Sequence, residues 1–164
     1  MAFHPLQRLL LGFSRLETFA TLFVGIVDLS EGTIRYCSAG HPPALLVGAG
    51  ADEISTLDVQ SGVVGAFHDI AYQDGVAHLV PGDVLLLYTD GTTEARNGGG
   101  AFFGEDGLRE AVMRESAGDK PFEGFVGRLL EALEAFTGRH LEDDVAMMAL
   151  RFDEVGRGEK GDPA

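Results

Sequence analysis

The segment from Asp83 to Arg96 has the sequence DVLLLYTDGTTEAR, and the rest of the chain can be interpreted as scaffold around it. Its apolar run from Val84 to Tyr88 ends abruptly at Thr89-Asp90-Gly91, which predicts a buried strand with a carboxylate at its end. Because a strand fixes the backbone of the residue that follows it, Asp90 is a candidate metal ligand. Another acidic group, Glu142-Asp143-Asp144, precedes a later apolar run and is the candidate partner of Asp90.

Composition limits the kinds of partner that the chain can have. Its 164 residues are the length of one domain, and 45% of them are hydrophobic, enough to form a core. It has 26 acidic and 12 basic residues and a net charge of -14, which argues against nucleic-acid binding. An anionic substrate would be repelled unless cations intervene, so a site made of carboxylates and divalent metals fits this balance.

The cysteine content and the N-terminus exclude several kinds of site and segment. The single cysteine, Cys37, excludes an internal disulfide and a multi-cysteine zinc site. The apolar N-terminus lacks a basic leading region and is interrupted by Arg8 and Arg15, so it predicts neither a signal peptide nor a membrane-spanning helix. We therefore expect a cytoplasmic protein without membrane attachment.

Hydrophobic periodicity predicts an α+β layered domain followed by a polar tail. The expected strands cover residues 19–28 and 33–39, which form a hairpin with a four-residue loop, and residues 44–47, 53–57, 69–79, 84–88 and 145–152. The expected helices cover 3–16, 105–116 and 121–136, and residues 97–100 form a flexible loop. Asp119 is the expected cap of the third helix and Gly138 its expected stop, and residues 153–164 are expected to be disordered.

Spacing alone leaves the chemistry of these residues open. Asp-Gly is also a common turn, and Asp143-Asp144 is also compatible with an ordinary solvated loop. His41, within Gly40-His41-Pro42-Pro43, is either a general acid or metal ligand, or a structural residue that shapes its loop through ring hydrogen bonds. Cys37 is predicted to be a thiol buried in the core. No phosphate-binding Walker motif occurs, since the only lysines are Lys120 and Lys160.

Three sequence blocks, taken in order, resemble one known family. The blocks are YCSAGHPP at Tyr36 to Pro43, PGDVLLLYTDGTTEA at Pro81 to Ala95 and DDVA at Asp143 to Ala146, with Phe102-Phe103-Gly104 after the second block. Over residues from about Phe19 to Phe152 the chain resembles the SpoIIE-type branch of the PPM (protein phosphatase 2C-like) metal-dependent serine/threonine phosphatases. The order and spacing of three blocks make this resemblance more specific than any single motif.

The resemblance implies a β-sandwich flanked by helices, with a binuclear Mn²⁺ or Mg²⁺ centre between the sheets. In such phosphatases a metal-activated water attacks phosphoserine or phosphothreonine directly. By motif position, Asp90 and Asp143 match metal-binding aspartates, with Asp144 as the alternative to Asp143. Gly91 follows Asp90 as the pattern requires, and Gly40 and His41 belong to a candidate site-shaping loop.

The resemblance also implies what this chain lacks and what it acts on. The family's N-terminal Gly-Asp and Asp-x-x-Gly-x-Gly blocks have no counterpart before Phe19. Residues 1–152 are therefore expected to be a partial, N-terminally truncated domain, with a residual helix over 1–18 and an incomplete, weak metal site.

The implied substrate is a phosphorylated anti-anti-sigma-factor-type regulator, and a longer parent chain would carry an upstream sensor domain. The alternative is a catalytically incomplete module that binds a regulatory partner without hydrolysis.

Overall fold

The computed structural model describes residues 19–49, 53–66, 71–118 and 120–154. The chain divides into two compact units. The first contains the described residues up to Pro43 together with Leu57–Val80, and the second contains Ala44–Thr56 and Pro81–Asp153. The predicted helix over 3–16 and most of the predicted tail lie outside the described residues. Strands and helices both contribute, so the predicted α+β class is confirmed.

The sheet of the first unit is arranged around strand β2 (Thr33–Ala39). Strand β1 (Leu22–Asp28) pairs with β2 in antiparallel fashion over its whole length, which confirms the predicted hairpin. Strand β6 (Gly75–His78) is antiparallel to β2, and the short strand β5 (Gln60–Ser61) is parallel to it. Residues 69–70 of the predicted strand over 69–79 lie outside the described residues, and of the rest only β6 is a strand, which is shorter than expected. Strand β5 was not predicted.

The sheet of the second unit has the strand order β4-β3-β7-β8. Strand β7 pairs in antiparallel fashion with β3 and with β8, so it is a central strand, and most of its residues are buried. These strands are β3 (Ala44–Val47), β4 (Ile54–Leu57), β7 (Val84–Tyr88) and β8 (Met147–Arg151). The central position of β7 agrees with the buried strand predicted from its apolar run.

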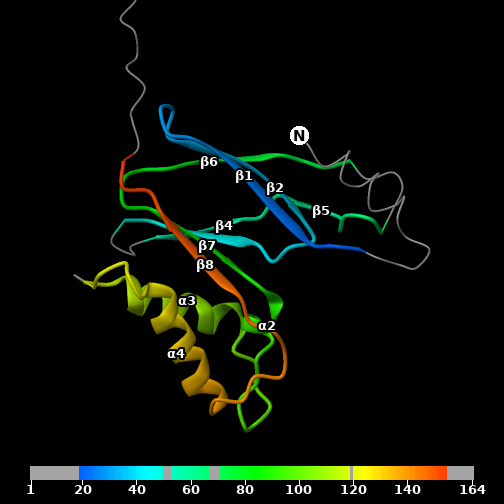
Figure 1. The fold of residues 1–164 in the computed structure, drawn as a ribbon, viewed down its shortest axis with the longest axis vertical. Helices are drawn as coiled ribbons and strands as arrows, with labels where there is room; N and C mark the ends of the chain where they lie inside the picture. Colours follow the sequence, from blue (N-terminus) through cyan, green and yellow to red (C-terminus); the bar gives the residue numbers. More distant parts are fainter. Residues whose placement is uncertain (1–18, 50–52, 67–70, 119, 155–164) are drawn as a thin grey trace, which may run out of the picture. The chain divides into compact units, whose positions relative to one another are not determined.

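Helices α3 (Gly104–Ser116) and α4 (Phe125–Thr137) pack on one face of this second sheet (Figure 1). Side chains alternate between the two faces of a strand, so Val84, Leu86 and Tyr88 all point to the helical side. There they form one core with residues of both helices and of β3: Leu45, Val47, Leu108, Ala111, Val112, Phe125 and Leu129. This core fixes the end of β7, where the candidate site begins.

The start of α4 differs from the prediction, whereas its end is confirmed. The helix begins at Phe125, and Gly124 precedes it in the left-handed conformation with φ 82°. A right-handed helix cannot continue through this left-handed residue, so the predicted helix start at 121 is wrong. The predicted cap, Asp119, lies outside the described residues and is six residues from the observed start. Gly138 ends the helix with φ 67°, as predicted.

No helix within the described parts of the chain is both long and apolar enough to span a bilayer.

Candidate functional site

Asp90 lies in a short helix that the sequence did not predict. Strand β7 ends at Tyr88, Thr89 follows, and helix α2 (Asp90–Thr93) begins at once. The Asp90 side chain is exposed, and its Oδ1 accepts a hydrogen bond from the backbone amide of Gly91 at 3.0 Å. The carboxylate keeps further lone pairs for another ligand, since each carboxylate has about four acceptor positions.

Thr89 joins this segment to the chain that enters β8. Its amide donates to the carbonyl of Ala146 at 3.0 Å. Its hydroxyl donates to the carbonyl of Asp144 at 3.1 Å and accepts from the amide of Ala146 at 3.0 Å. Three hydrogen bonds from one residue therefore hold the backbone that carries Asp144 next to the start of α2.

Gly91 brings the two acidic segments into direct contact. A Cβ atom on Gly91 would lie 2.5 Å from the carbonyl oxygen of Asp144 and 3.4 Å from Cβ of Asp143. The first distance is too short for any side chain, so this close approach requires glycine. Asp143 Oδ1 accepts a hydrogen bond from the amide of Asp144 at 2.7 Å. The structure thus places Asp90-Gly91 against Asp143-Asp144, the pairing that the sequence suggested.

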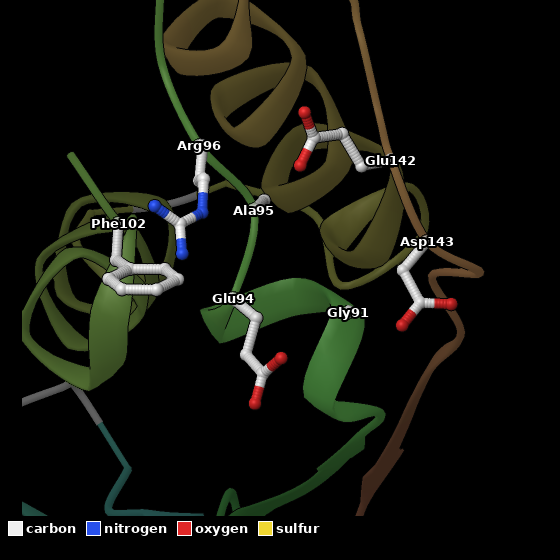
Figure 2. A pocket seen from close by; sticks show the side chains of 7 residues that line it. All are labelled: Gly91, Glu94, Ala95, Arg96, Phe102, Glu142 and Asp143. Atoms are coloured by element: carbon white, nitrogen blue, oxygen red, sulfur yellow. The ribbon is translucent and has the colours of Figure 1, made fainter. Parts of the chain in front are cut away.

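A cavity of about 380 Å³ opens beside this contact (Figure 2). Its lining comes from two segments, the stretch that includes and follows α2 and the acidic turn before β8. The lining residues are Gly91, Glu94, Ala95, Arg96, Phe102, Glu142 and Asp143. Three carboxylates and one guanidinium therefore surround a space large enough for a small polar group.

Four residues of this lining had no role assigned from the sequence: Glu94, Ala95, Arg96 and Phe102. Glu142 belongs to the acidic group that was predicted as the partner of Asp90. Arg96 and Phe102 face each other across the loop at 97–101, joined by an isolated antiparallel bridge, and the Arg96 guanidinium carbon lies 3.9 Å from the centre of the Phe102 ring. The sequence signal that could have indicated them is their position, because Thr93 to Arg96 precede the glycine-rich loop at 97–100 and Phe102-Phe103 follow it.

Gly40 and His41 belong to the first unit, whereas Asp90 and Asp143 belong to the second. His41 Nδ1 donates to the carbonyl of Pro42 at 2.9 Å, and Ser38 Oγ donates to the carbonyl of His41 at 3.1 Å. Gly40 has φ 70°, and a Cβ atom there would clash with a methyl carbon of Val63. These contacts are what a loop-shaping role requires, so they agree with the structural alternative for His41.

The chemical type of the candidate ligands suits a divalent metal. Carboxylate oxygens are the donors that Mg²⁺ and Mn²⁺ prefer, and the contact at Gly91 brings two carboxylate-bearing segments together. Within the described residues, no group of three histidine, cysteine, aspartate or glutamate side chains is arranged to hold a metal ion. Asp90 and Asp143 would thus be part of a coordination shell, with water or other groups supplying the remaining ligands.

Solved structures define the class of fold. The chain is similar to the SiaA-PP2C domain of Pseudomonas aeruginosa, with a TM-score of 0.79 at 19% identity over 92% of this chain and 59% of that one. It is also similar to the RsbU and RsbW domains of Rv1364c from Mycobacterium tuberculosis, with a TM-score of 0.74 at 27% identity over 94% and 43% of the two chains. The phosphatase domain of SpoIIE from Bacillus subtilis, in a structure presoaked with Mn, gives a TM-score of 0.68 at 16% identity over 93% and 65%. The fold is that of the PP2C-like phosphatases.

The sequence identifies the family within this class. A family model described as Stage II sporulation protein E (SpoIIE) matches residues 2–153, so the chain belongs to the SpoIIE family of PPM-type serine/threonine phosphatases. This finding confirms the resemblance drawn from the three sequence blocks. Phosphatases of the PP2C-like class depend in general on Mn²⁺ or Mg²⁺.

Two curated relatives show how much of a longer protein is matched. The chain is 29% identical to Protein IcfG of Synechocystis sp. over 132 residues, which is 80% of this chain and 20% of IcfG. It is 26% identical to the phosphoserine phosphatase RsbU of Bacillus subtilis over 133 residues, which is 81% of this chain and 39% of RsbU. The chain therefore spans well under half the length of both relatives.

Proposed function

We propose that this chain is the part of a metal-dependent protein serine/threonine phosphatase that contributes Asp90 and Asp143 to the metal centre. The observation that carries the proposal is the contact of Gly91 with Asp143-Asp144, which places Asp143 on the cavity and Asp90 directly before a lining residue. Membership of the SpoIIE family and the relative named a phosphoserine phosphatase support the reaction class.

The residues of this chain have distinct roles in the proposed reaction. Asp90 and Asp143 hold the metal, with Asp144 as the alternative to Asp143, and Thr89 and Gly91 keep the two acidic segments together. When bound, Mn²⁺ or Mg²⁺ supplies activation of water and stabilisation of charge on the phosphoryl group. Gly40 and His41 shape a loop of the first unit in this proposal.

The proposed substrate is a phosphorylated regulator of the anti-anti-sigma-factor type. RsbU is named a phosphoserine phosphatase, and the Rv1364c structure contains an RsbU domain together with an RsbW domain. These names support a role in a bacterial partner-switching pathway, in which phosphorylation decides which regulator binds which partner.

The test measures phosphate release by the purified chain from a phosphoserine peptide in the presence of Mn²⁺. We expect turnover that falls at least about a hundredfold in Asp90→Asn and in Asp143→Asn, because removing a charged ligand weakens metal binding. Asp58→Asn is the matched control, since Asp58 is exposed and belongs to the first unit. Equal turnover in Asp90→Asn and the wild-type chain would contradict the assigned metal role, and no turnover at all would contradict phosphatase activity of this chain.

A second candidate function is a module that binds a regulatory partner without hydrolysis. The observation in its favour is that both candidate ligands already accept hydrogen bonds from the amides of Gly91 and Asp144. Two carboxylates that share their oxygens with backbone amides would hold a single ion weakly. Stable binding of a phosphorylated anti-anti-sigma-type domain without phosphate release would favour this second function, whereas turnover that depends on Asp90 would exclude it.

A further inference from the structure

The cavity beside Gly91 has an unfavourable charge for a phosphorylated substrate. Three of its lining side chains, those of Glu94, Glu142 and Asp143, are exposed carboxylates. A phosphoryl group carries about -1.5 to -2 charges at neutral pH, so these carboxylates repel it. Arg96 is the only cationic side chain among the lining residues. Any direct attraction that the lining offers to a phosphoryl group therefore comes from Arg96.

We propose that Arg96 binds the phosphoryl group of the substrate and that Phe102 positions the Arg96 guanidinium for this contact. The inference rests on the proposed phosphatase function and adds a substrate-binding residue to it. Figure 2 shows Arg96 next to Phe102 on one side of the pocket, and Glu142 and Asp143 on the other side. A phosphoryl group bound by Arg96 would thus occupy the same cavity as the candidate metal ligand Asp143.

The position of Arg96 is fixed by its own loop. The Phe102 ring lies under the guanidinium at 3.9 Å, and the antiparallel bridge between Arg96 and Phe102 fixes the backbone beneath both side chains. Asn97 holds the loop between them, because its Oδ1 accepts from the amides of Gly99 at 2.9 Å and Ala101 at 3.0 Å. A side chain that is already ordered loses less conformational entropy when it binds a ligand.

The donors of Arg96 remain largely available. The guanidinium has five N–H donors, and within the described residues its hydrogen bond is that of one Nη to the carbonyl of Gly100 at 3.4 Å. The ion pairs among the described residues all join other side chains, so none of the lining carboxylates contacts Arg96 directly. Stacking on Phe102 occupies the face of the guanidinium and leaves its edge free, which is the edge that binds phosphate in bidentate fashion.

A purely structural role for Arg96 makes a different prediction. The stack on an exposed aromatic ring such as Phe102, which is 52% exposed, contributes about 0.5–1 kcal/mol to stability. If that were the whole role of Arg96, its replacement would lower the melting temperature slightly and would not distinguish phosphorylated from unphosphorylated ligands. Dependence of binding on the phosphoryl group separates the two roles.

The test compares binding of two peptides by fluorescence anisotropy in the presence of Mn²⁺. One peptide carries phosphonomethylalanine, a phosphoserine analogue that cannot be hydrolysed at its carbon–phosphorus bond, and the other carries serine at that position. We expect Arg96→Gln to weaken binding of the phosphonate peptide at least tenfold, with binding of the serine peptide unchanged. Arg96→Lys should recover part of the loss, because it restores charge without the planar fork, and Phe102→Leu should weaken binding about threefold.

Arg35→Gln is the matched control, because Arg35 is an exposed arginine on β2 of the first unit. It removes the same charge and should leave both peptides unaffected. The inference is overturned if Arg96→Gln binds the phosphonate peptide as tightly as Arg35→Gln does, or if the wild-type chain does not prefer the phosphonate peptide. Failure of the proposed function is seen separately, as absence of phosphate release from the phosphoserine peptide, since the binding assay requires no turnover.

Discussion

The hydroxyl of Thr89 accepts a hydrogen bond from the amide of Ala146 at 3.0 Å, which ties the end of β7 to the entry of β8. The same hydroxyl donates to the carbonyl of Asp144, so it fixes the turn that carries Asp143. The geometry of the candidate site therefore depends on a side chain that is not itself a candidate ligand.

Thr89→Val is expected to destabilise the chain by about 1–2 kcal/mol, because it leaves the Ala146 amide and the Asp144 carbonyl without the hydroxyl at almost unchanged volume. Urea denaturation of the wild type and the variant measures this difference. Mn²⁺ affinity should fall in the same variant, since the turn that carries Asp143 is released. Thr89→Ser keeps the hydroxyl and should retain most of the stability, so an equal loss in Thr89→Ser would contradict the assignment to the hydrogen bonds.

Gly91→Ala is expected to destabilise the chain by up to about 2 kcal/mol. Alanine gains up to about 1 kcal/mol over glycine in a helix, but the new Cβ would lie 2.5 Å from the carbonyl oxygen of Asp144, and backbone shifts of this kind cost about 1–3 kcal/mol. The clash decides the sign, because the obstructing atom belongs to the backbone. Thermal unfolding monitored by circular dichroism measures the effect.

The control for this prediction is Gly98→Ala. No atom outside its immediate neighbours lies within 4 Å of a Cβ atom added at Gly98. Its melting temperature should match that of the wild type. A Gly91→Ala chain as stable as Gly98→Ala would show that Gly91 does not approach the Asp143-Asp144 segment as closely as the structure has it.

Glu115 should make the stability of the chain depend on pH. Its carboxylate contacts Lys120 Nζ at 3.0 Å, Arg114 Nε at 3.1 Å and Arg128 Nε at 3.2 Å. The hydrogen bond from Lys120, followed by that from Arg114, lowers the pKa of Glu115 below its ordinary value of 4.5. A lowered pKa in the folded state means a contribution that is complete above the unfolded pKa and is lost as the pH falls through the folded pKa.

We therefore expect Glu115→Gln to destabilise the chain at pH 7, with solvent screening keeping the loss below about 1 kcal/mol. The difference from the wild type should shrink as the pH falls below 4.5. Urea denaturation at pH 7 and at pH 3 measures both values. Glu110→Gln, at an exposed position of the same helix, is the control and should change stability little at either pH. A Glu115→Gln deficit that is as large at pH 3 as at pH 7 would contradict the ion-pair explanation.

Cys37 should be unreactive toward thiol reagents in the folded chain. Its side chain is fully buried, and it packs with Ala39 and Val64 in the core of the first unit. Burial raises the pKa of the Cys37 thiol, so little reactive thiolate forms at neutral pH. Labelling with a chromogenic disulfide at pH 8 should be at least about a hundredfold slower than in urea-unfolded protein. Rapid labelling of the folded chain would show that this core opens readily.

Sequence patterns predicted those parts of the fold whose periodicity extends over several residues. The apolar run from Val84 to Tyr88 gave the central strand, and the hairpin over 19–39 was recovered because both of its strands are long. Gly138 was recovered as a helix stop because the left-handed conformation at a helix end favours glycine. Strand β5 was missed, since two residues cannot display a period of two.

Other features depend on contacts between distant residues and leave weaker signals. The apolar stripe of α4 extends back to Phe122, which packs on the core without being helical, so the helix was predicted too early. Helix α2 begins at an Asp-Gly pair, which favours a turn when read locally. The sequence does not show that Arg96 and Phe102 stack on each other across their loop, and only the structure reveals this contact.

The hydrogen bonds between Thr89 and Ala146 also close a long loop, since the two residues are 57 positions apart. Closing a flexible loop of that length costs roughly 3.5 kcal/mol in chain entropy, which a few hydrogen bonds cannot offset alone. The pairing of β7 with β8, which ends at Tyr88 and Met147, and the packing of α3 and α4 on β7 supply the missing stabilisation. Local opening of the acidic turn should then be coupled to loss of the helical pair. The Ala146 amide should therefore exchange its hydrogen with solvent no faster than the second unit unfolds.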